Sequence, residues 1–165
     1  MSVMSLRVLS AIAVVAAAGA AAAGTPAAVG TAAAGAGSCA TGMHRVTVRG
    51  HPGFRFCGPA SAVVRMGART IRFSNGLCRK AAGAFTVNIG TLVPGLRSGK
   101  PPYFGITTHT ARAGTQRNAA VGFTYRGRHY AVADQIVILA AGLQKGTFSG
   151  RVLGSTTKVS GSFRC

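Results

Sequence analysis

The side chains best suited to catalysis in this sequence are one carboxylate, four histidines and four cysteines. Hydrolysis by paired carboxylates needs two acidic groups, and Asp134 is the only acidic residue, so that mechanism is excluded. His129 and Asp134 could formally join a serine in a triad, but no G-x-S-x-G motif accompanies them. We therefore expect no catalytic residues and no enzyme activity. Asp134 is interpreted as the partner of a neighbouring arginine or as a cap for the segment that follows it.

Metal-binding patterns are equally poor. The sequence has no C-x-x-C or H-x-x-x-H pair, which argues against zinc, and it lacks the carboxylates that hard metal ions need. The histidines stand beside arginines in turn-like stretches and are predicted to be solvated surface residues; they are His44, His51, His109 and His129. We expect neither a metal site nor a cofactor.

The four cysteines, Cys39, Cys57, Cys78 and Cys165, form an even set that predicts two disulfides in an exported protein. Three pairings are possible. We favour Cys39–Cys57 with Cys78–Cys165, because the first would close a local N-terminal hairpin and the second would tie down the final strand. In the chain-entropy model, the longer loop would make the second bridge worth about 4.5 kcal/mol.

Charge is the strongest physical signal in the sequence. Removal of a leader that contains Arg7 would leave 18 of the 19 basic residues against one acidic residue, a net charge of 18 − 1 = +17. Such a surface attracts anionic polymers or anionic membrane surfaces without needing a specific pocket. The best candidates for exposed contacts are Arg126 and Arg128, at the tip of a predicted hairpin, followed by Arg79 and Lys80. No RNA-binding signature is present, so a specific nucleic-acid partner is not expected.

The N-terminus has the pattern of a secretory signal peptide. Arg7 is followed by an apolar run of mostly Ala, and small-residue cleavage sites end at residues 23 and 34. The sequence predicts a signal peptide over residues 1–23, with cleavage as late as residue 34 as the alternative, and a flexible Ala/Gly-rich segment over residues 24–38. Residues 39–165 then form one domain, with no transmembrane segment after cleavage.

Strand patterns recur along this domain, and helix patterns are weak. Alternation places Ile71 and Phe73 on one face of a strand, and Arg126-Gly127 forms a tight turn between two further strands. One continuous apolar run over 135–143 fits either a buried strand or a short helix. Glycines in the last two arms predict bulges or close backbone approaches. The sequence therefore predicts an all-β domain, either a β-sandwich or a partly open barrel, of about eight short strands. The expected strands cover 45–49, 61–66, 69–74, 84–90, 103–107, 121–125, 130–132, 146–153 and 158–165.

A cysteine shortly before an FTVNIG-like strand, here Cys78 and residues 85–90, is followed later by a Gly-x-x-x-Gly hairpin that ends at Cys165. With these motifs the chain resembles a group of small exported actinobacterial proteins, and in parts it is similar to the mycobacterial 19 kDa lipoprotein antigen family. The resemblance implies a surface-exposed, non-enzymatic β-domain with a Cys78–Cys165 disulfide. Lipoproteins are acylated on a cysteine directly after the signal peptide, but the residues before Cys39 form a poor lipobox because Ala36 replaces the usual leucine.

The function expected from these features is adhesion of a secreted, non-enzymatic domain to anionic polymers of the cell envelope or its surroundings. One alternative is a carrier that holds an apolar or lipid ligand between its sheets, because the chain must bury many Ala, Val and Ile side chains. Another alternative is a surface lipoprotein anchored through Cys39. No feature of the sequence indicates which oligomeric state the protein adopts.

Overall fold

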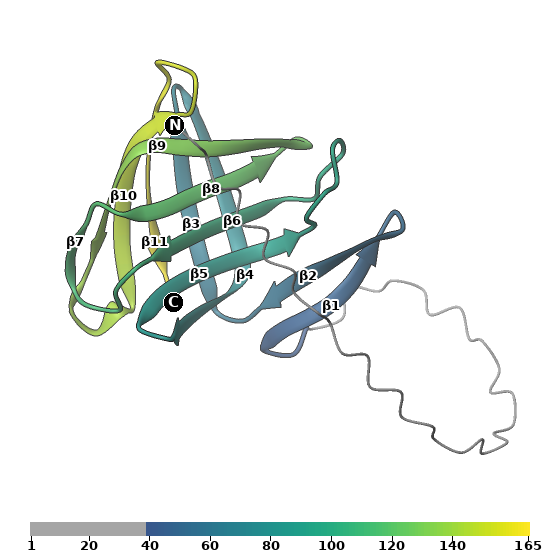
Figure 1. Ribbon diagram of the computed structural model, residues 1–165, viewed down its shortest axis with the longest axis horizontal. Coiled ribbons are helices and arrows are strands. Elements are labelled where there is room, and N and C mark those ends of the chain that lie inside the picture. The colour runs from purple at the N-terminus through teal and green to yellow at the C-terminus, as the bar shows by residue number, and fades with distance from the viewer. Residues whose placement is uncertain (1–38) are drawn as a thin grey trace, which may run out of the picture. The chain divides into compact units, whose positions relative to one another are not determined.

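The computed structural model describes residues 39–165, and β-strands make up nearly all of their regular structure (Figure 1). The predicted signal peptide, its two cleavage sites and the segment over residues 24–38 lie outside the described residues. Within residues 39–165, no helix has the length and apolar character needed to cross a membrane. The elements are β1 (Gly42–Val48), β2 (His51–Cys57), β3 (Ala60–Met66), β4 (Arg69–Ala81), β5 (Ala84–Leu92), β6 (Tyr103–Thr108), β7 (Gly114–Gln116), β8 (Ala119–Tyr125), β9 (Arg128–Leu139), the 3-10 helix η1 (Ala141–Leu143), β10 (Lys145–Val152) and β11 (Lys158–Arg164).

Eight of these strands close into an antiparallel barrel. The order around the barrel is β5-β4-β3-β11-β10-β9-β8-β6, and β6 pairs with β5 to complete the ring. The all-β prediction with about eight strands is therefore confirmed. The architecture is the barrel rather than the sandwich, and pairing of residues 85–90 with residues 103–108 closes it fully.

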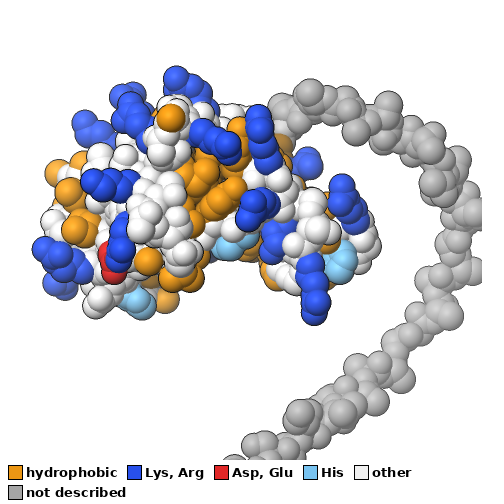
Figure 2. All heavy atoms as spheres, turned by 90° about the horizontal axis from the view of Figure 1, so that it is seen from above, with side chains coloured by type: hydrophobic (Ala, Val, Ile, Leu, Met, Phe, Trp, Pro, Cys, Tyr) orange, Lys and Arg blue, Asp and Glu red, His pale blue; other side chains and the backbone are white. Residues whose placement is uncertain are grey.

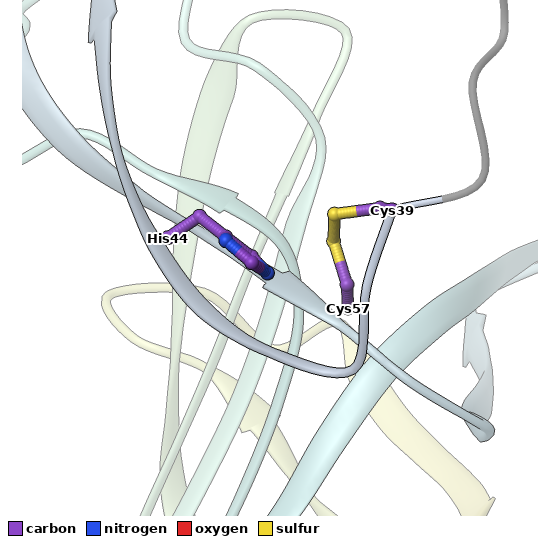
Figure 3. Close-up of side chains that lie close together, drawn as sticks. All are labelled: Cys39, His44 and Cys57. Carbon is purple, nitrogen blue, oxygen red and sulfur yellow. A yellow bond between two sulfur atoms is a disulfide. The ribbon is translucent and has the colours of Figure 1, made fainter.

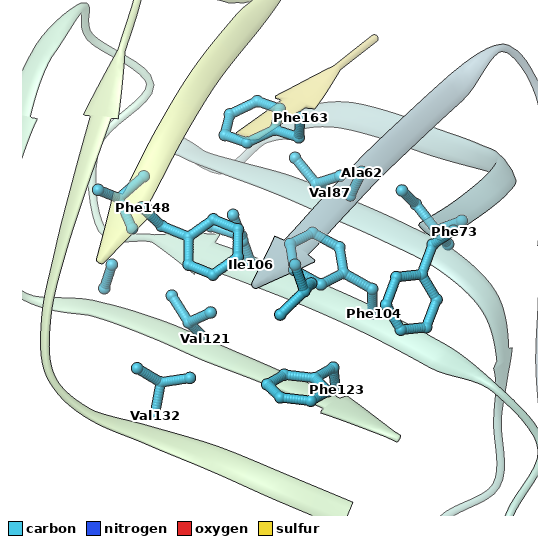
Figure 4. Packing of buried hydrophobic residues seen from close by; sticks show 14 of the residues in the cluster. Ala62, Phe73, Val87, Phe104, Ile106, Val121, Phe123, Val132, Phe148 and Phe163 are labelled. Carbon is cyan, nitrogen blue, oxygen red and sulfur yellow. The ribbon is translucent and has the colours of Figure 1, made fainter. Parts of the chain in front are cut away.

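Alternating side chains fill the barrel interior (Figure 4). Phe104, Phe123 and Phe163 are each no more than 1% exposed, and the predicted inward residues Ile71 and Phe73 are also buried. An eight-stranded barrel is just wide enough for such side chains to meet at its centre. Burial of these rings supplies the main hydrophobic contribution to stability.

Two glycines in the last hairpin make room for these rings. Gly146 pairs with Phe163 and Gly161 pairs with Phe148 in the β10–β11 register. A Cβ at either glycine would lie 2.5–2.6 Å from a ring carbon of its partner, closer than atoms approach. A Cβ at Gly146 would also lie 2.5 Å from the Ile138 carbonyl oxygen of the neighbouring strand, so the predicted close backbone approach is confirmed.

The hairpin of β1 and β2 lies outside the barrel and extends its wall. Residues 54–56 of β2 pair with residues 90–92 of β5, and β1 is the outermost strand. The partner of β5 changes at Gly90, from β4 before it to β2 from this residue onward. Gly90 has a φ of 89°, which glycine adopts without strain. The strand β2 gave little signal in the sequence because it opens with His51-Pro52-Gly53, residues that disfavour strands.

The ambiguous apolar run is resolved as the end of a strand followed by the short helix η1. β9 continues to Leu139 and pairs with β10. Val137 and Leu139 point into the barrel at 0% and 2% exposure, whereas Ile138 between them is 48% exposed. The run is apolar on both faces, but only one face is buried.

Both disulfides of the favoured pairing are present. Cys39 and Cys57 join with a Cα–Cα distance of 5.7 Å, and Cys78 and Cys165 join at 5.6 Å. The first fastens the start of the β1–β2 hairpin, and the second holds the end of β11 against β4. Two disulfides indicate an oxidising environment for the folded protein.

Candidate anion-binding site

The tip of the β8–β9 hairpin carries two of the predicted contact residues, Arg126 and Arg128. Tyr125 pairs directly with Arg128, so the turn consists of Arg126 and Gly127 alone. Their φ angles of 50° and 78° match a type I′ turn, which suits the right-handed twist of the flanking strands. The Arg126 guanidinium lies 5.3 Å from the centre of the Tyr125 ring, a cation–π contact that orients it.

The long loop between β5 and β6, over residues 93–102, lies against this tip. Lys100 forms an isolated bridge with Gly127, and a Cβ at Gly127 would lie 3.3 Å from the Cα of Gly99. The contact brings Arg97 and Lys100 beside the two hairpin arginines. The loop and the hairpin tip enclose an open hollow of about 550 Å³, here called the basic hollow, which is lined by Arg97, Ser98, Gly99, Lys100, Arg126, Gly127, Arg128 and His129.

A further arginine approaches from the β1–β2 hairpin. Val48 pairs with His51, so Arg49 and Gly50 form a two-residue turn of the same kind, with φ angles of 52° and 77°. The Arg49 guanidinium lies directly against Gly99, so close that a Cβ on residue 99 would collide with it. Three segments that are distant in sequence therefore contribute cations to one place.

His129 lies at the wall of the basic hollow. Its ring lies over Gly122, and its Nδ1 is 3.4 Å from the Thr124 hydroxyl. Partial burial lowers the pKa of His129, and the positive charge of Lys100 lowers it further. His129 is therefore mainly neutral at pH 7, and its protonation at lower pH would add a positive charge to the hollow.

No acidic side chain among residues 39–165 neutralises these cations. Asp134, the only acidic residue, accepts hydrogen bonds from the Arg151 guanidinium, including one of 2.9 Å from Nε. It lies in the left-handed region, with φ of 51°, at a bulge where the β9–β10 register shifts. The bulge needs Gly150 opposite, because a Cβ there would lie 2.6 Å from the Ala133 carbonyl oxygen. The predicted arginine partner of Asp134 is therefore confirmed.

Figure 2 looks down on the end of the molecule that carries the β3–β4, β8–β9 and β10–β11 turns in Figure 1. Lys and Arg side chains are spread over this face, and the single acidic side chain lies at one side of it. The face therefore presents positive charge with almost no compensation.

Arg79 and Lys80, the other predicted contacts, lie far from the basic hollow. They pair with Thr86 and Phe85 near the start of β5, whereas the 93–102 loop follows its end. A nine-residue strand spans roughly 27 Å. Arg79 and Lys80 line a separate hollow of about 320 Å³ that also includes Cys78 and Cys165.

The structure also brings together three potential metal ligands that the sequence spacing did not predict. Cys39, His44 and Cys57 place their sulfur and nitrogen atoms within 4.8 Å of one another (Figure 3). Both sulfurs are bonded to each other, and a ring nitrogen of His44 is 2.7 Å from the Ala40 carbonyl oxygen. In the disulfide form the cluster offers a metal ion no thiolate ligand.

The formal triad pair, His129 and Asp134, is not assembled. His129 contacts Thr124, whereas Asp134 binds Arg151. Sequence reasoning found Arg126 and Arg128 but missed Arg49, Arg97 and Lys100. An Arg-Gly pair occurs at residues 49–50 and again at residues 126–127, and this repeat could have identified Arg49 as a second turn arginine like Arg126.

No family model matches this chain, and neither a curated protein nor a solved structure matches it.

Proposed function

We propose that the protein is a secreted, non-enzymatic β-barrel domain that adheres to anionic polymers of the cell envelope or its surroundings. The observation that carries the proposal is the basic hollow, where Arg97, Lys100, Arg126 and Arg128 meet with no acidic side chain among the lining residues. Cations that the fold holds close together attract counterions. A polyanion that binds there releases these counterions, which makes the free energy of binding more favourable. Secretion is consistent with the two disulfides and with the leader-like N-terminal sequence.

Binding to an immobilised polyanion, measured across a salt series, tests the proposal. We expect measurable binding at low salt and a linear fall of log affinity with log salt concentration, because each neutralised charge releases counterions. Replacement of Arg126 and Arg128 by Gln should reduce the slope by roughly 1 to 2. A matched control replaces Arg112 and Arg117 by Gln, since both are exposed in the β6–β8 segment away from the hollow. Binding that is absent at low salt, or unchanged at high salt, would contradict the proposal.

The carrier alternative is less favoured by the packing. Phe104, Phe123 and Phe163 occupy the centre of the barrel at no more than 1% exposure. An apolar ligand there would have to displace these rings and leave their partners unpacked. Native mass spectrometry that found a co-purified lipid would revive this alternative.

The lipoprotein alternative requires a free sulfur on Cys39 for acylation. In the structure that sulfur is bonded to Cys57. An intact mass measured before and after reduction would decide between the two states, because an acylated chain would be heavier and would not form this disulfide.

A further inference from the structure

The basic hollow is wide and open to solvent. Its volume of about 550 Å³ equals roughly 18 water molecules at about 30 Å³ each. One small oxyanion would occupy only a fraction of this space. The hollow therefore has room for an extended ligand or for several charged groups together.

The number of cations points the same way. Five permanently charged side chains lie in or beside the hollow, namely Arg49, Arg97, Lys100, Arg126 and Arg128. A ligand with a single negative charge would leave most of these cations repelling one another. Closely spaced negative charges along one chain would neutralise several of them in a single binding event.

The residues that line the hollow itself are charged, polar or glycine. Apart from the charged residues and His129, the lining consists of Ser98, Gly99 and Gly127, so it offers no apolar wall for an acyl chain. The nearby Tyr125 ring is covered by the Arg126 guanidinium at 5.3 Å. The lining contains no Phe, Tyr or Trp side chain on which a nucleic-acid base or a sugar ring could stack.

Two of the arginines occupy strained turn positions. Arg49 and Arg126 both have left-handed φ angles, in two-residue turns where Asn or Gly would fit with less strain. The matching turn at the other end of the barrel, between β4 and β5, has Ala82 before Gly83 at the same two positions. The left-handed turn is therefore not special to the hollow, but in these two turns the first residue is an arginine: Arg126 lines the hollow, and the Arg49 guanidinium lies against Gly99 in its lining.

Building on the proposed function, we propose that the basic hollow binds a linear phosphate polymer through consecutive phosphate groups. In such a polymer each repeating unit carries its negative charge on the chain itself, so successive charges lie closer together than the carboxylates at the ends of poly-glutamate side chains and can meet several guanidinium groups at once. The polymer carries its charge on its backbone, so it needs neither a stacking platform nor an apolar wall.

Competition between polyanions tests this inference on the full chain. Inorganic polyphosphate, poly-glutamate, heparin, single-stranded DNA and anionic vesicles are compared at one ionic strength near 150 mM, where diffuse attraction is largely screened. We expect polyphosphate to bind at least about tenfold more tightly than poly-glutamate of similar charge. Comparable affinity for the two would overturn the inference and leave the proposed function intact. Tighter binding of heparin, DNA or vesicles than of polyphosphate would also overturn the assignment to a phosphate chain. Failure of every polyanion to bind at low salt would refute the proposed function itself.

Variants locate the binding in the hollow. A triple variant carries Arg97→Gln, Arg126→Asn and Arg128→Gln, and its matched control carries Arg72→Gln, Arg112→Gln and Arg117→Gln at exposed positions elsewhere. We expect the first to lose the preference for polyphosphate and the control to retain it. Equal losses in both variants would show that net charge alone is responsible, and thermal unfolding of each variant checks that the fold is intact.

Discussion

Replacement of Arg126 by Asn separates the binding role of this residue from its structural role. Arg126 occupies the first position of the β8–β9 turn with φ of 50°. Left-handed backbone costs an ordinary residue about 1 kcal/mol, whereas Asn adopts it with little penalty. The variant also loses the cation–π contact with Tyr125, worth about 0.5 kcal/mol at an exposed site. The net expectation is that Arg126→Asn is as stable as the original protein or more stable by about 0.5 kcal/mol.

Binding should change in the opposite direction. Loss of one charge-assisted contact at an exposed site is worth about 1 kcal/mol, or roughly a fivefold loss of affinity for polyphosphate. The slope of log affinity against log salt should fall by a little less than 1. A more stable protein that binds less tightly is the signature of a strained residue kept for function.

Thermal unfolding and a binding titration of the same sample measure both effects. Ala82→Asn is the matched control, because Ala82 holds the same turn position at the opposite end of the barrel with φ of 48°. We expect the control to gain stability with no change in binding. Destabilisation of Arg126→Asn by more than about 1 kcal/mol would show that the arginine serves the fold, since relief of the backbone strain is expected to offset the loss of the cation–π contact. Unchanged binding would show that it does not contact the ligand.

Three further predictions follow from other parts of the structure. Affinity for polyphosphate should rise as pH falls through the lowered pKa of His129, because protonation adds a positive charge to the hollow, and His129→Gln should flatten this dependence in titrations at several pH values. Burial raises the pKa of Tyr103 to about 12, so the unfolded state ionises first and chemical denaturation should show stability falling as pH rises from about 10 toward 12. Tyr103→Phe should remove this loss of stability at alkaline pH. It should also lower the unfolding free energy by about 1 kcal/mol at neutral pH, because the Tyr103 hydroxyl donates a 2.6 Å hydrogen bond to Asn88. If the variant still lost stability at alkaline pH, Tyr103 would not be the group responsible. Replacement of both Cys78 and Cys165 by Ser should lower the unfolding free energy by up to about 4.5 kcal/mol, and a loss below about 1 kcal/mol would mean that β11 is held by its strand pairing alone.

Much of the fold could be predicted from local patterns. The first half of β4 and the whole of β5 alternate cleanly, so inward residues like Phe73 and Ile89 could be identified from their period of two. Whether the sheet is open or closed could not be predicted from local patterns, because closure depends on pairing of β5 with β6 across the Pro101-Pro102 break. Strand alternation is the same in a sandwich and in a barrel.

The candidate site was predictable only in part. Arg126 and Arg128 were found because a two-residue hairpin turn is a local signal. Lys100 and Arg49 join them through contacts between a loop, a turn and a hairpin that are far apart in sequence, and no local pattern encodes such contacts. The grouping of Arg79 and Lys80 with the hairpin arginines rested on charge alone, and the structure places them near the other end of β5.

An NMR titration of the isotope-labelled protein with a short polyphosphate would locate the binding site residue by residue. We expect the amide signals of residues 97–100 and 126–129 to shift together and to saturate at one affinity, since these residues line one hollow. Small shifts spread over exposed basic residues everywhere, or shifts centred on residues 79–80, would contradict a binding site at the basic hollow.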